Sequence, residues 1–177
     1  FSGSNYRSNI LSRQNRDDEF GSSLDHLGDF NGDGISDITV AGYKTYGRKN
    51  GERYSEAFVL FGVDADYVNF SVYDLDGANG FKIVNEELGY IRVSAVGDFD
   101  GDGLSDLSVD TFEGTWLLYG RSTPGPATIS LTNLDPVFGF QLTGDAGRLL
   151  AAGDVNGDGA DDFLVNSRTD RESYLVY

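Results

Sequence analysis

Several residue types are absent or scarce in this 177-residue chain, and each absence removes a class of function. Cysteine and methionine are missing, histidine occurs once and proline three times. Without cysteine the chain has no disulfide and no thiol nucleophile, so disulfides give no indication of its compartment. No apolar run approaches the roughly 20 residues that a membrane-spanning helix needs, so the sequence predicts no span.

Basic residues are also few. Lys and Arg number 13 against 29 Asp and Glu, giving a net charge of −16. A surface so acidic repels phosphate backbones, which excludes nucleic-acid binding. Glycine is abundant at 24 residues, which favours tight turns over long helices. We expect the single histidine, His26, to pack between blades or to line the axial channel rather than act in catalysis, and no serine has the context of a nucleophile elbow.

One acidic nine-residue segment occurs three times, at residues 29–37, 98–106 and 154–162, here called the first, second and third loop. Each has Asp or Asn at positions 1, 3, 5 and 9 and glycine at positions 4 and 6. Side-chain oxygens alternating along a tight turn converge on a hard cation, and the position-7 carbonyl adds a ligand. The sequence therefore predicts three Ca²⁺ sites. Their ligands are Asp29, Asn31, Asp33, Ile35 and Asp37; Asp98, Asp100, Asp102, Leu104 and Asp106; and Asp154, Asn156, Asp158, Ala160 and Asp162.

The residues around each loop decide which calcium motif this is. An EF-hand needs a bidentate acid at position 12 and then a helix, but position 12 is Val40, Val109 or Val165. Apolar residues alternate after position 9 and also precede position 1, which predicts a strand on each side. The unit is strand, loop, strand, and the EF-hand is rejected. We expect structural sites, the second binding tightest because Asp100 replaces Asn.

The repeat extends beyond the loops. Residues 58–62 (Phe-Val-Leu-Phe-Gly) are matched by 116–120 and by 174–177, and residues 71–81 are echoed by 130–140. Each repeat thus reads as four short strands, the composition of one β-propeller blade. We predict a single all-β domain over 1–177 with repeats at about 1–62, 63–120 and 121–177. The predicted core between blades is Phe58, Phe61, Trp116, Tyr119, Tyr174 and Tyr177.

Phe61-Gly62 and the three loops make the chain resemble the FG-GAP repeat family, also called integrin-alpha-like or VCBS-type, which forms calcium-binding β-propellers. The resemblance implies a secreted, periplasmic or cell-surface protein that serves as an adhesion, interaction or scaffold module. Lectin-like modules and carbohydrate-active enzymes also use such repeats. The alternative is therefore a carbohydrate-binding domain, or a lyase or hydrolase built on a propeller.

Three blades are fewer than the four to eight of closed propellers. Residues 1–5 align with the fourth strand at 81–85 and 140–144, so this segment is a candidate outer strand for the last blade. Two explanations stay open. In the first, the chain is a piece of a longer propeller, and its start at Phe1 indicates that it was trimmed. In the second, two chains form a six-bladed homodimeric ring by exchanging end strands.

A basic and aromatic segment in the first repeat suggests a binding surface. Seven of the 13 Lys and Arg residues lie in this repeat. Aromatic faces beside cations suit sugars, carboxylates or an acidic protein, so we expect a glycan or protein partner. The candidate ligand-binding residues are Tyr43, Lys44, Tyr46, Arg48, Lys49, Arg53 and Tyr54.

Overall fold

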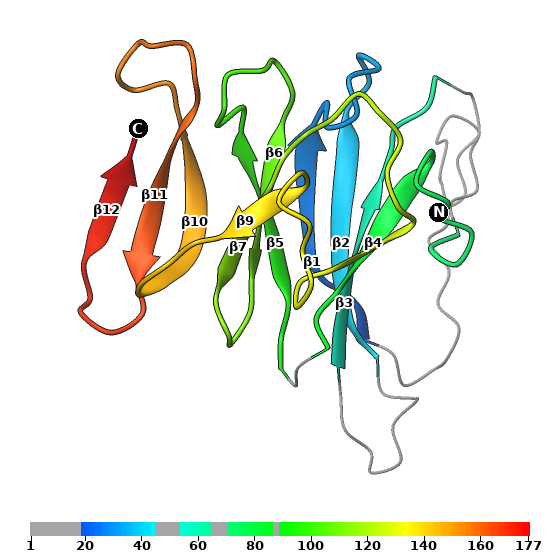
Figure 1. The fold of residues 1–177 in the computed structure, drawn as a ribbon, viewed down its shortest axis with the longest axis horizontal. Helices are drawn as coiled ribbons and strands as arrows, with labels where there is room; N and C mark the ends of the chain where they lie inside the picture. Colours follow the sequence, from blue (N-terminus) through cyan, green and yellow to red (C-terminus); the bar gives the residue numbers. More distant parts are fainter. Residues whose placement is uncertain (1–18, 45–53, 65–70, 87–88) are drawn as a thin grey trace, which may run out of the picture.

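The computed structural model describes residues 19–44, 54–64, 71–86 and 89–177. This part of the chain consists of twelve strands without a helix, which confirms the all-β class (Figure 1). It accordingly holds no helix long and apolar enough to cross a membrane. The strands are β1 (Glu19–Gly28), β2 (Asp37–Lys44), β3 (Tyr54–Leu60), β4 (Gly80–Val84), β5 (Arg92–Gly97), β6 (Asp106–Asp110), β7 (Thr115–Leu118), β8 (Thr128–Ser130), β9 (Gly139–Gln141), β10 (Ala146–Gly153), β11 (Asp162–Ser167) and β12 (Ser173–Val176).

The strands form three sheets that follow one another along the chain. The first sheet has the order β1-β2-β3-β4-β8, the second β5-β6-β7-β9 and the third β10-β11-β12. In each sheet, one strand leads into an acidic loop and its antiparallel partner begins at position 9 of that loop. The predicted strand, loop, strand unit is therefore confirmed three times. The sheets stand side by side, with all three loops at one end of the molecule (Figure 1, top).

Each loop begins at the same irregularity in strand pairing. The register shifts between His26 and Gly28 before the first loop, and at the corresponding residues before the second and third loops. Such a bulge bends the strand and changes where the following side chains point. The glycines at positions 4 and 6 then adopt positive φ, +77° and +84° at Gly32 and Gly34, which costs glycine little. The local sequence thus dictates a sharp reversal at each acidic loop.

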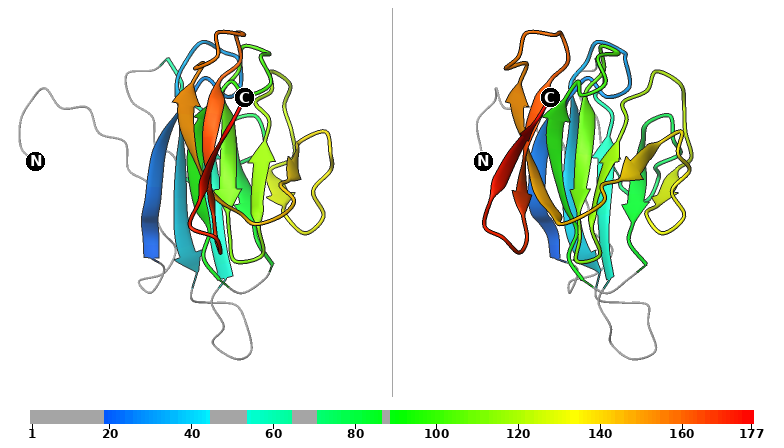
Figure 2. Two further views of the ribbon diagram at one scale, coloured as in Figure 1. Left: turned by 90° about the vertical axis from the view of Figure 1, so that its left-hand side faces the viewer. Right: turned by 60° about the vertical axis from the view of Figure 1, so that its left-hand side comes forward.

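One strand pairing was not predicted from the sequence. β8 comes from the segment between β7 and β9 of the second sheet, yet it pairs in parallel with β4 of the first sheet. This crossing strand ties the second repeat to the first. Figure 2 shows the segment that contains β8 and β9 on the side of the molecule away from β1. The candidate outer strand at residues 1–5 lies outside the described residues, and the described third sheet has three strands.

The core lies between neighbouring sheets. Val59, Val93 and Trp116 belong to a buried cluster between the first and second sheets, and Leu117 and Leu149 to another between the second and third. The first strands of successive sheets contact one another, β1 against β5 and β5 against β10. The aliphatic and aromatic residues of the strands are therefore used mainly to join sheets.

The predicted core between blades is correct for Phe61 and Trp116 and holds in part for Tyr119, which is half-buried between the second and third sheets. It is wrong for Phe58, which packs in a separate cluster on the outer face of the first sheet, and for the tyrosines of the third sheet. Phe58, Phe61 and Trp116 are buried, whereas Tyr174 and Tyr177 are 47% and 76% exposed. The two tyrosines are exposed because no further sheet among the described residues covers β12.

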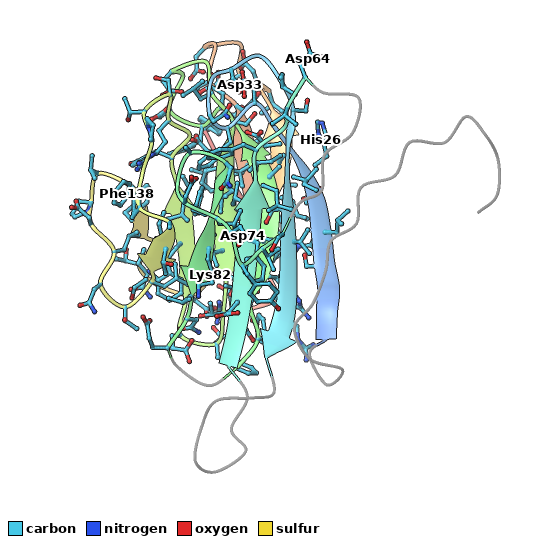
Figure 3. All side chains as sticks on the ribbon, turned by 90° about the vertical axis from the view of Figure 1, so that its right-hand side faces the viewer. His26, Asp33, Asp64, Asp74, Lys82 and Phe138 are labelled. Carbon is cyan, nitrogen blue, oxygen red and sulfur yellow. The ribbon has the colours of Figure 1, made fainter. Side chains whose placement is uncertain are left out.

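His26 was expected to pack between blades or to line the axial channel, and the first of these is wrong. It is exposed on β1 near the loop end of the molecule (Figure 3). It shares the outer face of the first sheet with Leu24, because alternate residues of a strand point to the same side. No other described sheet packs on that part of the face.

Candidate metal centres

The position-1 carboxylate organises each loop. In the first loop, Asp29 Oδ1 accepts hydrogen bonds from the amides of Gly32 (2.7 Å) and Asp33 (3.2 Å), and Oδ2 from that of Gly34 (2.8 Å). Asp154 accepts from the same three amides of its own loop, and Asp98 from those at positions 5 and 6. These bonds curl the backbone around the first carboxylate, so the following side chains are held on a tight turn.

Positions 3 and 5 add two further side chains that each close a small turn. Asn31 Oδ1 accepts from the Asp33 amide at 3.1 Å, and Asp33 Oδ1 accepts from the Ile35 amide at 2.8 Å. The second and third loops repeat both bonds. Side chains that bond to the backbone two residues ahead favour this turn over continued strand. The three loops therefore share one conformation, as their shared sequence predicts.

The position-9 aspartates are the buried members of the set. Asp37, Asp106 and Asp162 are 0%, 0% and 1% exposed. In each, one carboxylate oxygen accepts from the position-2 amide across the loop, at 2.8 to 2.9 Å. This bond fixes the carboxylate at the base of the loop, where the second strand begins.

In the first two sheets, the position-9 aspartate also explains the Phe-Gly signature. The other oxygen of Asp37 accepts from the Gly62 amide at 2.7 Å, and Asp106 binds Gly120 in the same way. A Cβ on Gly62 would lie 2.4 Å from the carbonyl oxygen of Ser36, so only glycine fits there. This role was missed from the sequence, although the spacing between loop and Phe-Gly pair is a signal that could have suggested it.

Carboxylate oxygens converge most closely in the second loop. Oxygens of Asp98, Asp100 and Asp106 all lie within 4.8 Å of one another, a group that could hold a metal ion. Asp102 lies outside this group. The first and third loops have Asn31 and Asn156 in place of Asp100, so they offer one carboxylate fewer at positions 1, 3, 5 and 9. The ligand role of the position-7 carbonyls of Ile35, Leu104 and Ala160 stays a prediction.

The electrostatics of the loops favour a cation. Burial raises the pKa of Asp106 to about 6, although the Gly120 and Phe99 amides oppose the shift, and the charges of Asp100 and Asp102 add to it. Burial also raises the pKa of Asp37 and of Asp100. In the described part of the chain, the two Lys or Arg ion pairs with carboxylates join Lys82 to Glu56 and Arg168 to Asp110, outside the loops. Within the described ranges, the loop carboxylates thus face one another without a basic partner. An all-oxygen set of this charge fits Ca²⁺, a hard cation.

The candidate ligand-binding segment is only partly described. Tyr46, Arg48, Lys49 and Arg53 lie outside the described residues, so their proposed role stays a prediction. The backbones of Tyr43 and Lys44 pair with those of Ser55 and Tyr54, where β2 and β3 meet at the end opposite the loops.

An aromatic group at that same end was missed from the sequence. Phe112 is 66% exposed, and its ring centroid lies 4.6 Å from that of Tyr90 in an edge-on arrangement. The Arg92 guanidinium lies over the Tyr90 ring at 4.8 Å. These residues come from two different strand ends of the second sheet, and no local pattern joins them.

Successive loops are joined by a contact that was also missed. The Ser105 amide, at position 8 of the second loop, donates to the Asp29 carbonyl of the first at 2.8 Å. The Asp161 amide of the third loop donates in the same way to Asp98 at 2.7 Å. The glycine before each receiving loop gives room for this approach. A Cβ on Gly28 or Gly97 would lie about 2 Å from the position-8 side chain, at 2.2 Å and 2.1 Å respectively. We call this pair of contacts the loop lock.

No protein-family model matches the chain, and a search of curated proteins finds no match.

Proposed function

We propose that this chain is a calcium-stabilised part of a β-propeller of the FG-GAP type, which works as an interaction or scaffold module outside the cytosol. The observation that carries the proposal is the threefold loop, in which buried and exposed aspartates gather with no basic partner in the part of the chain that the structure describes. Three sheets side by side, each joined to the next through its first strand, also suit propeller blades.

Each residue type in the loop would have a distinct task. Asp98, Asp100 and Asp106 would hold the cation directly, since their oxygens already converge. Bound Ca²⁺ would neutralise carboxylates that otherwise repel one another. Asp106 also holds the Gly120 amide, so the cation site is linked to the end of β7 through one side chain. Sites of this kind in extracellular modules bind with dissociation constants of about 10⁻⁴ to 10⁻³ M, which favours a calcium-rich compartment.

Calcium titration by calorimetry, together with thermal unfolding followed by Trp116 fluorescence, tests the proposal. We expect three binding events and a marked fall in melting temperature when a chelator is added. Asp100→Asn gives the second loop the same ligand types as the other two, so it should weaken the tightest site by about tenfold, because calcium affinity follows ligand charge.

The matched control is Asp76→Asn. Asp76 accepts amides from Ala78 (2.9 Å) and Asn79 (3.1 Å) in an acidic turn outside the three loops. It should leave every calcium affinity unchanged. Absence of calcium heat, or a melting temperature indifferent to chelator, would refute the proposal.

Carbohydrate binding is the second candidate, and the exposed Phe112–Tyr90 pair with Arg92 favours it. Aromatic faces beside a cation pack against sugar rings and bind their acidic groups. A glycan array probed in calcium tests this candidate, and Phe112→Ser should abolish any signal that this surface produces. An array without signal would eliminate it.

A further inference from the structure

The third sheet presents an apolar row on its outer face. Leu150 pairs with Leu164, and Leu164 pairs with Leu175, so the three side chains lie next to one another across β10, β11 and β12. They are 38%, 38% and 41% exposed. Val155, at position 2 of the third loop, is 54% exposed beyond the end of the row. We call Leu150, Leu164 and Leu175 the leucine row.

The corresponding row in each of the other sheets is covered by the next sheet. In the second sheet it consists of Ser94, Ser108 and Leu117, which are 6%, 2% and 0% exposed. Leu117 packs there against Leu149 of the third sheet. The leucine row therefore occupies the face by which one sheet of this protein receives the following sheet, and it is more apolar than its covered counterpart.

The third sheet also has only the receiving side of a loop lock. Gly153 corresponds to Gly28 and Gly97, but a Cβ built on it would meet nothing within 4 Å. Among the described residues, no backbone amide donates to the Asp154 carbonyl, the counterpart of the bonded Asp29 and Asp98 carbonyls. At the positions that the other two interfaces cover, the third sheet thus offers a row of leucines, a carbonyl without a donor among the described residues and an open glycine.

The first sheet carries the other side of such an interface, the face that in the second and third sheets receives the preceding sheet. Leu24 is 64% exposed, whereas the equivalent residues Val93 and Leu149 are 2% and 0% exposed because the preceding sheet covers them. Val40 and Phe58, which continue the row of Leu24 across the first sheet, are buried against Val72 of the same chain, so Leu24 is the open residue of this row. Ser36, at position 8 of the first loop, is exposed, and its amide has no acceptor among the described residues. The first and third sheets lie on opposite sides of the molecule (Figure 1).

The geometry points to a second copy of this chain as the partner of the third sheet. The leucine row of one copy packs against the Leu24 face of the other, and the Ser36 amide donates to the Asp154 carbonyl as Ser105 does to Asp29. The contact is head to tail, so two copies can close on each other with two equal interfaces. A second copy is the occupant because one chain carries both halves of an interface that it already makes twice within itself. The inference deepens the proposed function by naming a partner, and it rests on the blade-like arrangement proposed there.

Light scattering in millimolar calcium and at high micromolar protein concentration gives the first test. We expect a mass of about 38 kDa, twice the 19.2 kDa of one chain. Leu164→Asp and, separately, Leu24→Asp should each reduce the mass to that of one chain, because each charge removes one side of both interfaces. Leu175→Asp provides a second variant of the leucine row. Val137→Asp, at a 67% exposed position on neither face, is the control and should keep the wild-type mass.

Mixing the two variants tests the head-to-tail geometry. The Leu24→Asp protein keeps its leucine row and the Leu164→Asp protein keeps its Leu24 face, so the mixture should regain a species of about 38 kDa. A wild-type mass of one chain would overturn the inference. So would a Leu24→Asp protein that still dimerises alone, since this indicates contact between two leucine rows. Calcium calorimetry on the same samples separates the proposals, because three binding events in a monomer would retain the calcium sites and reject the second copy.

Discussion

Removing the guanidinium of Arg168 should loosen the contact between the second and third sheets. Arg168 follows β11 at the end opposite the loops and donates five hydrogen bonds. Its Nη2 binds Asp110 Oδ1 at 2.6 Å and the Thr111 carbonyl at 2.7 Å, and its Nε binds the Ala146 carbonyl at 2.8 Å. One side chain therefore joins β10 and β11 to the turn between β6 and β7.

The expected loss follows from the burial of the pair. The side chain of Asp110 is 7% exposed and that of Arg168 is 27% exposed. Breaking a fully buried ion pair costs about 3–5 kcal/mol, whereas an exposed ion pair contributes about 0.2–1 kcal/mol. The Arg168–Asp110 pair lies between these cases, so Arg168→Ala should lower the free energy of unfolding by about 2 kcal/mol. For a chain of this length that corresponds to a fall in melting temperature of roughly 4–8 °C.

Urea unfolding in saturating calcium, followed by the fluorescence of the buried Trp116, measures the loss of stability. Arg148→Ala removes an exposed arginine from β10 and serves as the control. The double variant Arg168→Ala/Asp110→Asn should be less destabilised than the sum of the two single variants, because it leaves no unpaired buried charge. A loss below about 0.5 kcal/mol, the level of an exposed pair, would refute the reasoning.

Two further predictions use the same unfolding assay. Gly97 and Gly153 both have positive φ, but a Cβ on Gly97 would lie 2.1 Å from the Asp161 carboxylate, whereas Gly153 is open. Gly153→Ala should lower the free energy of unfolding by about 1–2 kcal/mol, from backbone conformation alone. Gly97→Ala should lower it by about 1–3 kcal/mol more, because the added Cβ overlaps Asp161. Equal losses in the two variants would disprove the loop lock. Hydrogen bonds from Ser167 and Thr169 hold the pKa of Asp145 below its ordinary value of 3.8. A carboxyl whose pKa is lowered in the folded state stabilises the protein above pH 4, and this contribution disappears as the pH falls through the folded-state pKa. The Asp145→Asn variant should therefore be less stable than wild type above pH 4, and the difference in stability should shrink at lower pH. A difference that stays constant from pH 2 to 6 would contradict this.

Features encoded in short stretches of sequence were predicted well. The loop residues, the glycines at positions 4 and 6 and the flanking strands all depend on neighbours within nine residues, so local pattern identified them. The interactions that complete the site join distant residues. Asp37 reaches Gly62, 25 residues further on, and Arg168 reaches Asp110, 58 residues back. No period in the sequence encodes such pairs.

The errors concern burial at the two ends of the row of sheets. Tyr174 and Tyr177 occupy the positions of buried aromatics in the other repeats, so their pattern predicts core. Whether a strand face is covered depends on the presence of a neighbouring sheet rather than on the strand itself. The same reasoning applies to His26 on the outer face of the first sheet.

The second and third sheets are fastened at two opposite ends, by the loop lock between Asp98 and Asp161 and by Arg168 beneath. Under the proposed function only the first fastening would depend on calcium, because it joins two of the loops that would hold the ion. Loss of the ion would weaken the contact at the loop end, while the Arg168 bonds and the buried Leu117 and Leu149 would keep the two sheets together. Calcium would then set how firmly one end of this pair of sheets is held, and the opposite end would be indifferent to it.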